Sequence, residues 1–281
     1  MNYDHAFHAG NFADVVKHVA LVRILLHLAR KEKPFRVIDT HAGAGAYDLA
    51  GDERAARTGE WQDGVARVAA IPPDTQAGAM LAPWRALLGP ALAAGGPGEY
   101  PGSPVLAQRL MRDQDRAVFC ETHPRARAAL QGRIGRDARA KCLALDGWTA
   151  LNAFTPPPER RGLVLVDPPF EQPNDFRRLA ENGLRAYAKW PTGVYAFWHP
   201  VKDGRDRDAL LRGWRGAGPK LLRLEWGVGE PVAEGRLAQA GLLVVNPPFP
   251  LQGEMGVLLP ALVGAMARNG AGHALVEPFG A

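Results

Sequence analysis

The chain has 281 residues, of which 47% are hydrophobic and 22% charged, with a net charge of +5 and a pI of about 9.4. This composition is typical of a globular protein with a sizeable core, in one or two domains. No run of about 18 apolar residues occurs and the polar N-terminus lacks a signal-peptide core, which excludes a membrane span and predicts a cytoplasmic protein. Cys120 and Cys142 fall in strand-like stretches and are expected to be reduced. The basic balance favours a polyanionic partner.

The first predicted element is a helix from Asn11 to about Arg30. Asn11 is expected to be its N-cap, with Asp14 three positions later as in a capping box. Apolar residues recur at helical spacing along this segment, namely Val15, Val19, Val22 and Leu26. A short strand, Arg36–Asp39, follows and leads into a glycine-containing loop.

Residues 49–102 differ in composition from the rest of the chain. They are rich in Ala, Gly and Pro and have helical patterns at 61–70 and 77–92. We predict that they form a small helical subdomain, inserted after the first strand between the two parts of a main domain, 1–48 and 103–281.

Beyond this segment, strands alternate with helices. The predicted strands cover 117–121, 141–145, 162–166, 193–198, 220–226 and 241–245, with a short last strand at 274–276. Such alternation predicts an α/β fold with a mostly parallel sheet of about seven strands flanked by helices. The pattern leaves open which of the late strands runs antiparallel.

Nine residues occur almost twice in the chain. The segment 162–170, GLVLVDPPF, is echoed by 241–249, GLLVVNPPF. Each copy is a short buried-type strand that ends in a polar residue, two prolines and an aromatic residue. Such a turn suits a planar amino group, because the Asp or Asn side chain accepts one N–H and a backbone carbonyl at the first Pro accepts the other. The aromatic ring then stacks on the captured base.

Polar residues stand at the carboxyl ends of the predicted strands, where sheets of this kind bind ligands. The first strand ends in a loop with Gly43 and Gly45, which allow backbone to approach a ligand closely. Glu121 ends the second strand and suits a ribose diol, Asp146 ends the third and suits an adenine amino group, and Asp167 ends the fourth. An NAD site needs similar features, but the G-x-G-x-x-G spacing is missing.

This series resembles the S-adenosylmethionine-dependent methyltransferases of the Rossmann-like class I, in which D-x-x-x-G-x-G and D-P-P-[YFW] mark methylation of an adenine amino group. Over nearly the whole chain the sequence is similar to the RlmJ family, which methylates N6 of one adenosine in 23S ribosomal RNA. The segments that carry this resemblance are 7–18 (FHAGNFADVVKH), 39–45 (DTHAGAG), 100–104 (YPGSP), 121–124 (ETHP), 146–147 (DG), 160–162 (RRG) and 246–248 (NPP).

The resemblance implies roles for individual residues. The cofactor is S-adenosylmethionine, and its methionine end is assigned to Lys17, His18, His41 and Ser103. Its ribose is assigned to Glu121, and its adenine to Asp146 and Gly147. The resemblance assigns catalysis to Asp167, with Tyr3 on the substrate side. Pro168, Pro169 and Phe170 complete the catalytic motif, and Asp167 is also expected to contact the cofactor. Phe170 stands where the family more often has Tyr, a change that keeps the ring face needed for stacking.

Asp167, rather than Asn246, is expected to be the site, because it adjoins the strand ends that face the cofactor. Asn246 is interpreted as part of a Pro-Pro turn that closes a strand, although N-P-P-Y marks some DNA and protein-glutamine methylating enzymes. The open alternatives are a DNA adenine-N6 or protein-glutamine methyltransferase and a non-catalytic RNA-binding protein with the same fold. We expect no metal, because the histidines lack Cys partners and His18 and His41 have other roles. We also expect a monomer.

Overall fold

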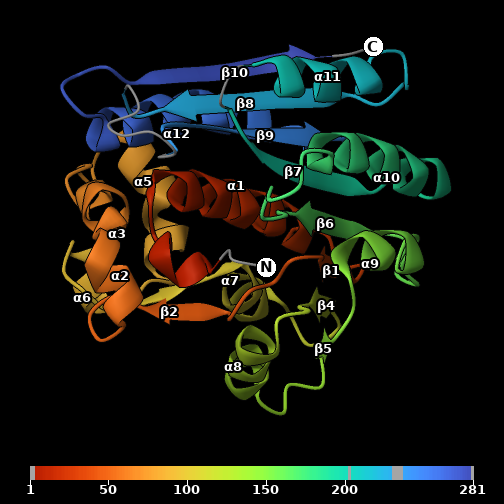
Figure 1. Ribbon diagram of the computed structural model, residues 1–281, viewed down its shortest axis with the longest axis horizontal. Coiled ribbons are helices and arrows are strands. Elements are labelled where there is room, and N and C mark those ends of the chain that lie inside the picture. The colour runs from red at the N-terminus through yellow and green to blue at the C-terminus, as the bar shows by residue number, and fades with distance from the viewer. Residues whose placement is uncertain (1–3, 202–203, 230–236, 280–281) are drawn as a thin grey trace.

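The computed structural model describes residues 4–201, 204–229 and 237–279. Its main feature is an eight-stranded sheet with the order β10-β8-β9-β7-β6-β1-β4-β5 (Figure 1). The strands are β1 (Arg36–Asp39), β4 (Arg116–Cys120), β5 (Ala140–Leu143), β6 (Gly162–Val166), β7 (Val194–Pro200), β8 (Leu221–Gly227), β9 (Gln239–Val245) and β10 (His273–Phe279). The predicted α/β class with a mostly parallel sheet is confirmed. The sheet has eight strands where about seven were expected, and the short last strand predicted at 274–276 extends over His273–Phe279.

The sheet has a parallel half and an antiparallel half. The strands β5, β4, β1, β6 and β7 are all parallel to their neighbours within this half. β9 runs antiparallel to β7, and β8 and β10 continue in antiparallel pairings. The carboxyl ends of the five parallel strands therefore share one edge, whereas β9 ends at the opposite edge.

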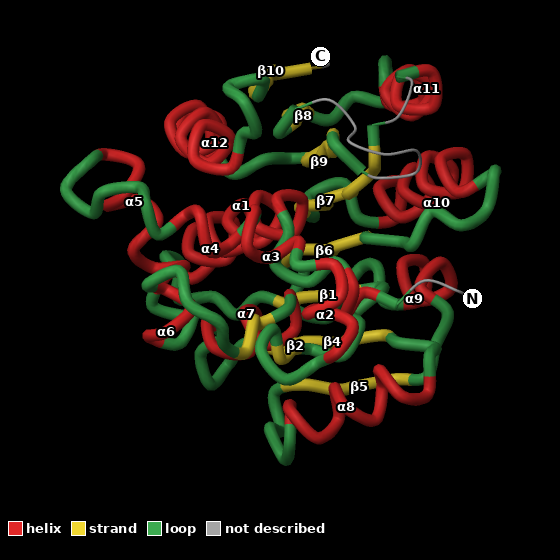
Figure 2. Tube along the Cα trace, turned by 60° about the vertical axis from the view of Figure 1, so that its left-hand side comes forward, coloured by secondary structure: helices red, strands yellow, loops and turns green. Residues whose placement is uncertain are grey.

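Helices cover both faces of the sheet (Figure 2). One face carries α1 (Phe12–Ala29), α7 (Ser103–Leu110) and α12 (Leu251–Met266), and the other carries α9 (Gly147–Ala153), α10 (Asp175–Lys189) and α11 (Arg205–Trp214). Helix α8 (Pro124–Ile134) connects β4 to β5. No helix within the described ranges is long and apolar enough to cross a membrane.

Helix α1 lies inside the molecule and positions several polar side chains there. Val15, Val16, Ile24 and Leu25 are fully buried, as expected for a helix that is apolar on most of its surface. The predicted N-cap is confirmed, because the Asn11 side chain accepts hydrogen bonds from the backbone N–H groups of the first turn. The capping-box prediction is wrong: the Asp14 carboxylate accepts from the N–H of Gly10.

The segment after β1 forms small elements that pack onto α1 and α12. They are β2 (Ala46–Asp48), α2 (Glu53–Thr58), α3 (Glu60–Asp63), α4 (Val65–Val68), α5 (Gln76–Arg85), α6 (Pro90–Ala93) and β3 (Glu99–Pro101). The antiparallel pair β2–β3, which the sequence did not predict, brings the two ends of this segment together. Trp84 and Leu81 of α5 belong to the same hydrophobic cluster as Leu25 of α1 and Leu259 of α12. The segment thus buries its apolar side chains against the main sheet's helices.

Candidate active site

A cavity of 1340 Å³ lies at the carboxyl edge of the parallel strands. Most of the residues predicted for the site line it, namely Lys17, His18, His41, Gly43, Ser103, Glu121, Asp146, Gly147, Asp167, Pro168 and Pro169. Gly45 and Phe170 lie outside the lining, and Tyr3 lies outside the described residues. The edge brings these residues together because parallel strands end side by side.

The glycine loop after β1 is held against the end of β4. The backbone N–H of Gly43 donates to Oε2 of Glu121 at 2.8 Å, and the N–H of His123 donates to Oε1 at 2.6 Å. Gly43 has a φ of +63°, and a Cβ there would lie 2.4 Å from the Tyr47 hydroxyl. Gly45 has a φ of +82°, and its Cβ would meet Leu130 of α8, so Gly45 serves the packing of the loop on that helix. Only glycine fits both positions.

A second group of polar side chains lies under the loop. His18 is 1% exposed, and its Nδ1 lies 2.7 Å from the hydroxyl of Tyr100. Burial lowers the pKa of His18 to about 3, so the imidazole is neutral. The hydroxyl of Ser103 donates to Oδ2 of Asp39 at 2.7 Å, and burial raises the pKa of Asp39 to about 6 despite this bond. Asp39 was not predicted as a site residue, although it begins the glycine-loop motif.

Gly147, the first residue of the helix that follows β5, lies against His41. Nδ1 of His41 lies 2.8 Å from Oγ1 of Thr40, and burial lowers the pKa of His41 to about 4. A Cβ at Gly147 would lie 2.5 Å from His41 Cε1 and from the Thr40 carbonyl oxygen, so this close approach requires glycine. Oδ2 of Asp146 caps helix α9 by accepting from the Thr149 N–H at 2.9 Å. Asp146 therefore both caps a helix and lines the cavity.

Asp167 sits at the end of β6 beside a buried lysine. Nζ of Lys17 lies 2.5 Å from Oδ2 of Asp167, and the Asp167 side chain is 17% exposed. Phe170 follows with a φ of +50°, a conformation that is rare and strained for a bulky residue. Its ring packs against Phe176 and Trp198, with ring centroids 4.8 and 5.8 Å away.

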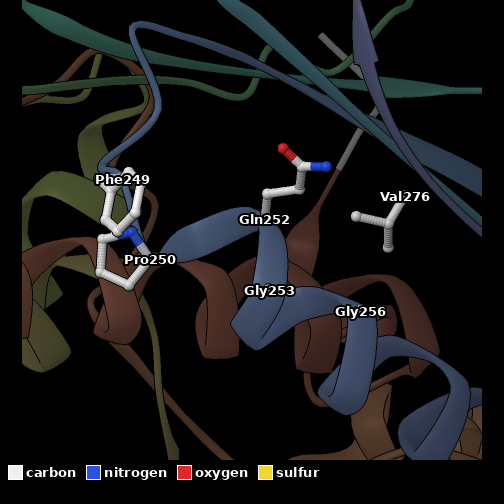
Figure 3. A pocket seen from close by; sticks show the side chains of 6 residues that line it. All are labelled: Phe249, Pro250, Gln252, Gly253, Gly256 and Val276. Atoms are coloured by element: carbon white, nitrogen blue, oxygen red, sulfur yellow. The ribbon is translucent and has the colours of Figure 1, made fainter.

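The second motif, Asn246-Pro247-Pro248-Phe249, lies at the opposite edge of the sheet because β9 is antiparallel to β7. Nδ2 of Asn246 donates to the carbonyl oxygens of Pro191 at 2.7 Å and Gly193 at 2.8 Å. Phe249 is 97% exposed and borders a surface hollow of 440 Å³ at the start of α12 (Figure 3). The polar side chain of this motif is thus used to join a strand end to the loop before β7.

Sequence reasoning missed the carboxylate of Asp14 as a partner of the cavity residue Lys17. It lies one helical turn before Lys17, and Nζ of Lys17 lies 2.8 Å from its Oδ1. The spacing of Asp14, Lys17 and His18 in α1 was the available signal. His5 and Arg178 also line the cavity and were not predicted as site residues. The guanidinium of Arg178 lies over the Trp148 ring, 4.9 Å from its centroid. No feature of the sequence marks Arg178 as a cavity residue.

The cavity residues fit S-adenosylmethionine on chemical grounds. Gly43 and Gly147 let the backbone of the cavity wall pack closely, because a Cβ there would collide with the Tyr47 hydroxyl and with the Thr40 carbonyl oxygen. Glu121 of the same lining is a carboxylate suited to a diol, and Lys17 supplies a cation suited to the carboxylate of a methionine. The described residues contain no cluster of three or more His, Cys, Asp or Glu side chains arranged for a metal ion.

The sheet order, the helices on both faces and the glycine loop after β1 define a Rossmann-like class I methyltransferase fold. A probable spermidine synthase from Corynebacterium glutamicum shares this fold, with a TM-score of 0.50 and 14% identity over 96% of this chain and 75% of that one. The crystal structure of protein LPL1258 from Legionella pneumophila is far more similar, with a TM-score of 0.87 and 30% identity over 97% of this chain and 98% of that one.

Sequence comparison identifies the family. Residues 32–278 match the family described as "Ribosomal RNA large subunit methyltransferase D, RlmJ". Proteins named ribosomal RNA large subunit methyltransferase J from Escherichia coli and Haemophilus influenzae are 36% and 34% identical to the chain, each over 99% of it and 98% of the relative. The chain belongs to the RlmJ family. It is an S-adenosylmethionine-dependent methyltransferase of ribosomal RNA.

Proposed function

We propose that the enzyme methylates the N6 amino group of one adenosine in 23S ribosomal RNA, and that Asp167 is the residue that captures this group. The observation that carries the proposal is the position of Asp167, which lines the 1340 Å³ cavity next to Lys17 and to the glycine loop. The motif Asp167-Pro168-Pro169-Phe170 offers two acceptors and a ring, as capture of a planar amine requires.

The chain's contribution to the reaction follows from the chemistry of the amine. The N6 lone pair is delocalised into the adenine ring and is a poor nucleophile. Hydrogen bonds from N6 to the Asp167 carboxylate and the Pro168 carbonyl favour a pyramidal nitrogen and aim its lone pair. The carboxylate also stabilises the positive charge that develops on N6. Bound S-adenosylmethionine supplies an electrophilic methyl group on its sulfonium.

The target base has to leave its stack to reach this cavity. Phe170 directly follows Pro169 of the cavity lining and is half-buried beside Phe176 and Trp198, and its ring is the face on which we propose that the extruded base stacks. The strained backbone of Phe170 supports this role, because strain of this kind concentrates at functional sites. Tyr3 is assigned to the substrate side through the family resemblance.

The cofactor contacts that we propose follow the lining of the cavity. Lys17, His18, His41 and Ser103 hold the methionine end, and Glu121 accepts from the ribose hydroxyls. Asp146 and Gly147 contact the adenine. Oδ2 of Asp146 accepts from the N–H and hydroxyl of Thr149 at the start of α9, which leaves Oδ1 for the ligand. Gly43 and Gly45 fix the shape of the loop beside these contacts.

The decisive experiment uses labelled S-adenosylmethionine and a protein-free 23S rRNA transcript, followed by nucleoside analysis. We expect one N6-methyladenosine per transcript with the native enzyme and with Asn246→Ala. Asp167→Ala is expected to abolish transfer while S-adenosylmethionine binding, measured by calorimetry, persists. A fully active Asp167→Ala enzyme would remove Asp167 from the mechanism.

Parallel reactions test the alternative substrates. Transfer to duplex DNA or to a protein glutamine in preference to RNA would replace the RNA proposal with one of those activities. RNA binding without transfer at saturating cofactor would instead indicate a non-catalytic RNA-binding protein. We expect neither result, because the motif at Asp167 is intact.

We also propose the organisation in which the enzyme acts. Residues 49–102 form an inserted helical subdomain, and 1–48 with 103–281 form the catalytic domain; pairing of β2 with β3 at the ends of the segment supports this division. The enzyme acts as a monomer in the cytoplasm, where its RNA substrate is made. Sedimentation analysis tests the monomer, and a dimer at micromolar concentration would contradict it.

A further inference from the structure

Asp14 is a buried carboxylate that joins three parts of the N-terminal region. It lies in the first turn of α1 and is 2% exposed. Its Oδ2 lies 2.8 Å from Nε2 of His5 and accepts from the Gly10 N–H at 3.1 Å, whereas Oδ1 accepts from Nζ of Lys17 at 2.8 Å. Burial raises the pKa of Asp14, but the charges of His5 and Lys17 outweigh it and hold that pKa well below its usual range. Asp14 is therefore ionised at neutral pH.

Lys17 is shared between this anion and Asp167. It is 4% exposed, and its Nζ lies 2.8 Å from Asp14 Oδ1 and 2.5 Å from Asp167 Oδ2. Burial lowers the pKa of Lys17, but the two carboxylates together raise it above its usual range. One ammonium group thus stands between two carboxylates, and its position depends on both of them.

The arrangement matters because Asp167 has two tasks. Oδ2 contacts Lys17, and no hydrogen bond from the described part of the chain reaches Oδ1. Without Asp14, the buried Lys17 ammonium would pair with Asp167 alone, because a buried charge is costly unless an opposite charge compensates it. A carboxylate neutralised in this way is a weaker acceptor for the N–H of a substrate amine.

We propose that Asp14 is a positioning residue for methyl transfer: it holds the Lys17 ammonium on one oxygen of Asp167 and leaves the other oxygen to the substrate amino group. This inference rests on the proposed function, in which Asp167 captures N6. Asp14 touches neither substrate nor cofactor in this scheme and acts through Lys17 alone.

Asp14→Asn tests the proposal, with Asp115→Asn as the matched control. Asp115 is also a fully buried carboxylate that accepts from backbone N–H groups and a basic side chain, but it lies before β4, at the edge away from the cavity. We expect Asp14→Asn to lower kcat for RNA methylation about tenfold or more, equivalent to ~1.4 kcal/mol, with little change in the KM for RNA. Asp115→Asn is expected to keep kcat per folded enzyme. A kcat within twofold of wild type in folded Asp14→Asn would overturn the proposal.

A double-mutant cycle separates positioning through Lys17 from a general structural role. Lys17→Met removes the ammonium, and the combined variant with Asp14→Asn is expected to be no slower than Lys17→Met alone, because contacting residues that act as a unit are not additive. Losses that multiply in the combined variant would show that Asp14 acts independently of Lys17 and would contradict the inference.

A second variant covers the case in which Asp14→Asn does not fold. Asp14→Glu keeps the charge but moves the carboxylate by one methylene, so we expect folded protein with a lowered kcat; a wild-type kcat would count against positioning. Failure of the proposed function is distinguishable, because it appears as activity in Asp167→Ala or as transfer to another substrate in the native enzyme. Failure of this inference leaves both of those results unchanged.

Discussion

The first motif, Asp167-Pro168-Pro169-Phe170, and the second motif, Asn246-Pro247-Pro248-Phe249, follow strands of almost identical sequence. Both strands are fully or almost fully buried. β6 runs parallel to its neighbours, however, and β9 runs antiparallel to β7, so the two motifs stand at opposite edges of one sheet. Two nearly identical nine-residue segments thus point their polar turn at a ligand cavity in one case and at a backbone loop in the other.

The backbone of the two motifs differs as well. In the second motif the residue with a positive φ is Asn246, a residue type that adopts this conformation readily. In the first motif it is Phe170, whose bulky side chain disfavours it. Asn246 places its amide on two carbonyl oxygens, whereas Asp167 contacts a buried ammonium. The comparison teaches that local sequence supplies a turn with acceptors, and that strand direction decides what the turn faces.

The largest expected effect comes from exchanging the polar residues of the two motifs. Asp167→Asn removes the carboxylate that stabilises charge on N6, and we expect kcat to fall about 100-fold or more in the radiometric RNA assay. Asn246→Asp, which gives the second motif the sequence of the first, is expected to leave kcat per folded enzyme unchanged. The enzyme that carries both exchanges is expected to be as slow as Asp167→Asn. Recovered activity in it would mean that the second motif also reaches substrate.

The aromatic residues sharpen the same comparison. Phe170→Ala removes the stacking face, and base–aromatic stacking contributes about 1–3 kcal/mol per base, so KM for RNA is expected to rise about 5–150-fold. Phe249→Ala is expected to change KM by less than twofold, because Phe249 lies at the far edge and is 97% exposed. Initial methylation rates over a range of rRNA transcript concentrations give both KM values. Equal losses in both variants would place RNA on both edges.

The two edges also differ in how they respond to acid. His18 and His41 lie at the edge of the first motif, and burial lowers their pKa values to about 3 and about 4. Between these values and about 6.5 the unfolded chain binds protons that the native state does not, so stability rises with pH and falls as pH drops. Asp39, with a raised pKa of about 6, opposes part of this loss.

Urea unfolding between pH 7 and 4 measures this dependence. His18→Gln is expected to reduce the slope by up to one proton, about 1.4 kcal/mol per pH unit. Asn246→Ala is expected to leave the slope unchanged, since Asn246 does not titrate. An unchanged slope in His18→Gln would mean that His18 is protonated in the native protein.

The smallest effect is expected on stability at the second motif. Asn246→Ala loses an exposed hydrogen bond to the carbonyl oxygen of Pro191 and a partly buried one to that of Gly193, so the free energy of unfolding is expected to fall by about 1 kcal/mol. Chemical denaturation at pH 7 provides the measurement. No loss at all would show that water replaces the amide without cost.

Local signals were sufficient to predict most elements of this fold. Helical spacing and the Asn11 cap predicted α1 to within a residue, and apolar runs predicted β1 and β6 with their observed bounds. The pair β2–β3 was missed because three-residue strands carry no periodic pattern. Asp14 was interpreted through capping, although its partners include Lys17 in the next turn and His5, and only the packing of the chain before α1 brings His5 to it.

The sequence by itself determined the class of fold, the succession of the main strands and helices along the chain, and the ends of β1 and β6, because these depend on periodicity and on short motifs. Only the tertiary structure decided that β9 is antiparallel, that Asn246 bonds to backbone, and that Lys17 lies between Asp14 and Asp167. Those facts depend on contacts between residues up to 150 positions apart, as for Lys17 and Asp167, and no local pattern encodes the direction in which a distant strand joins the sheet.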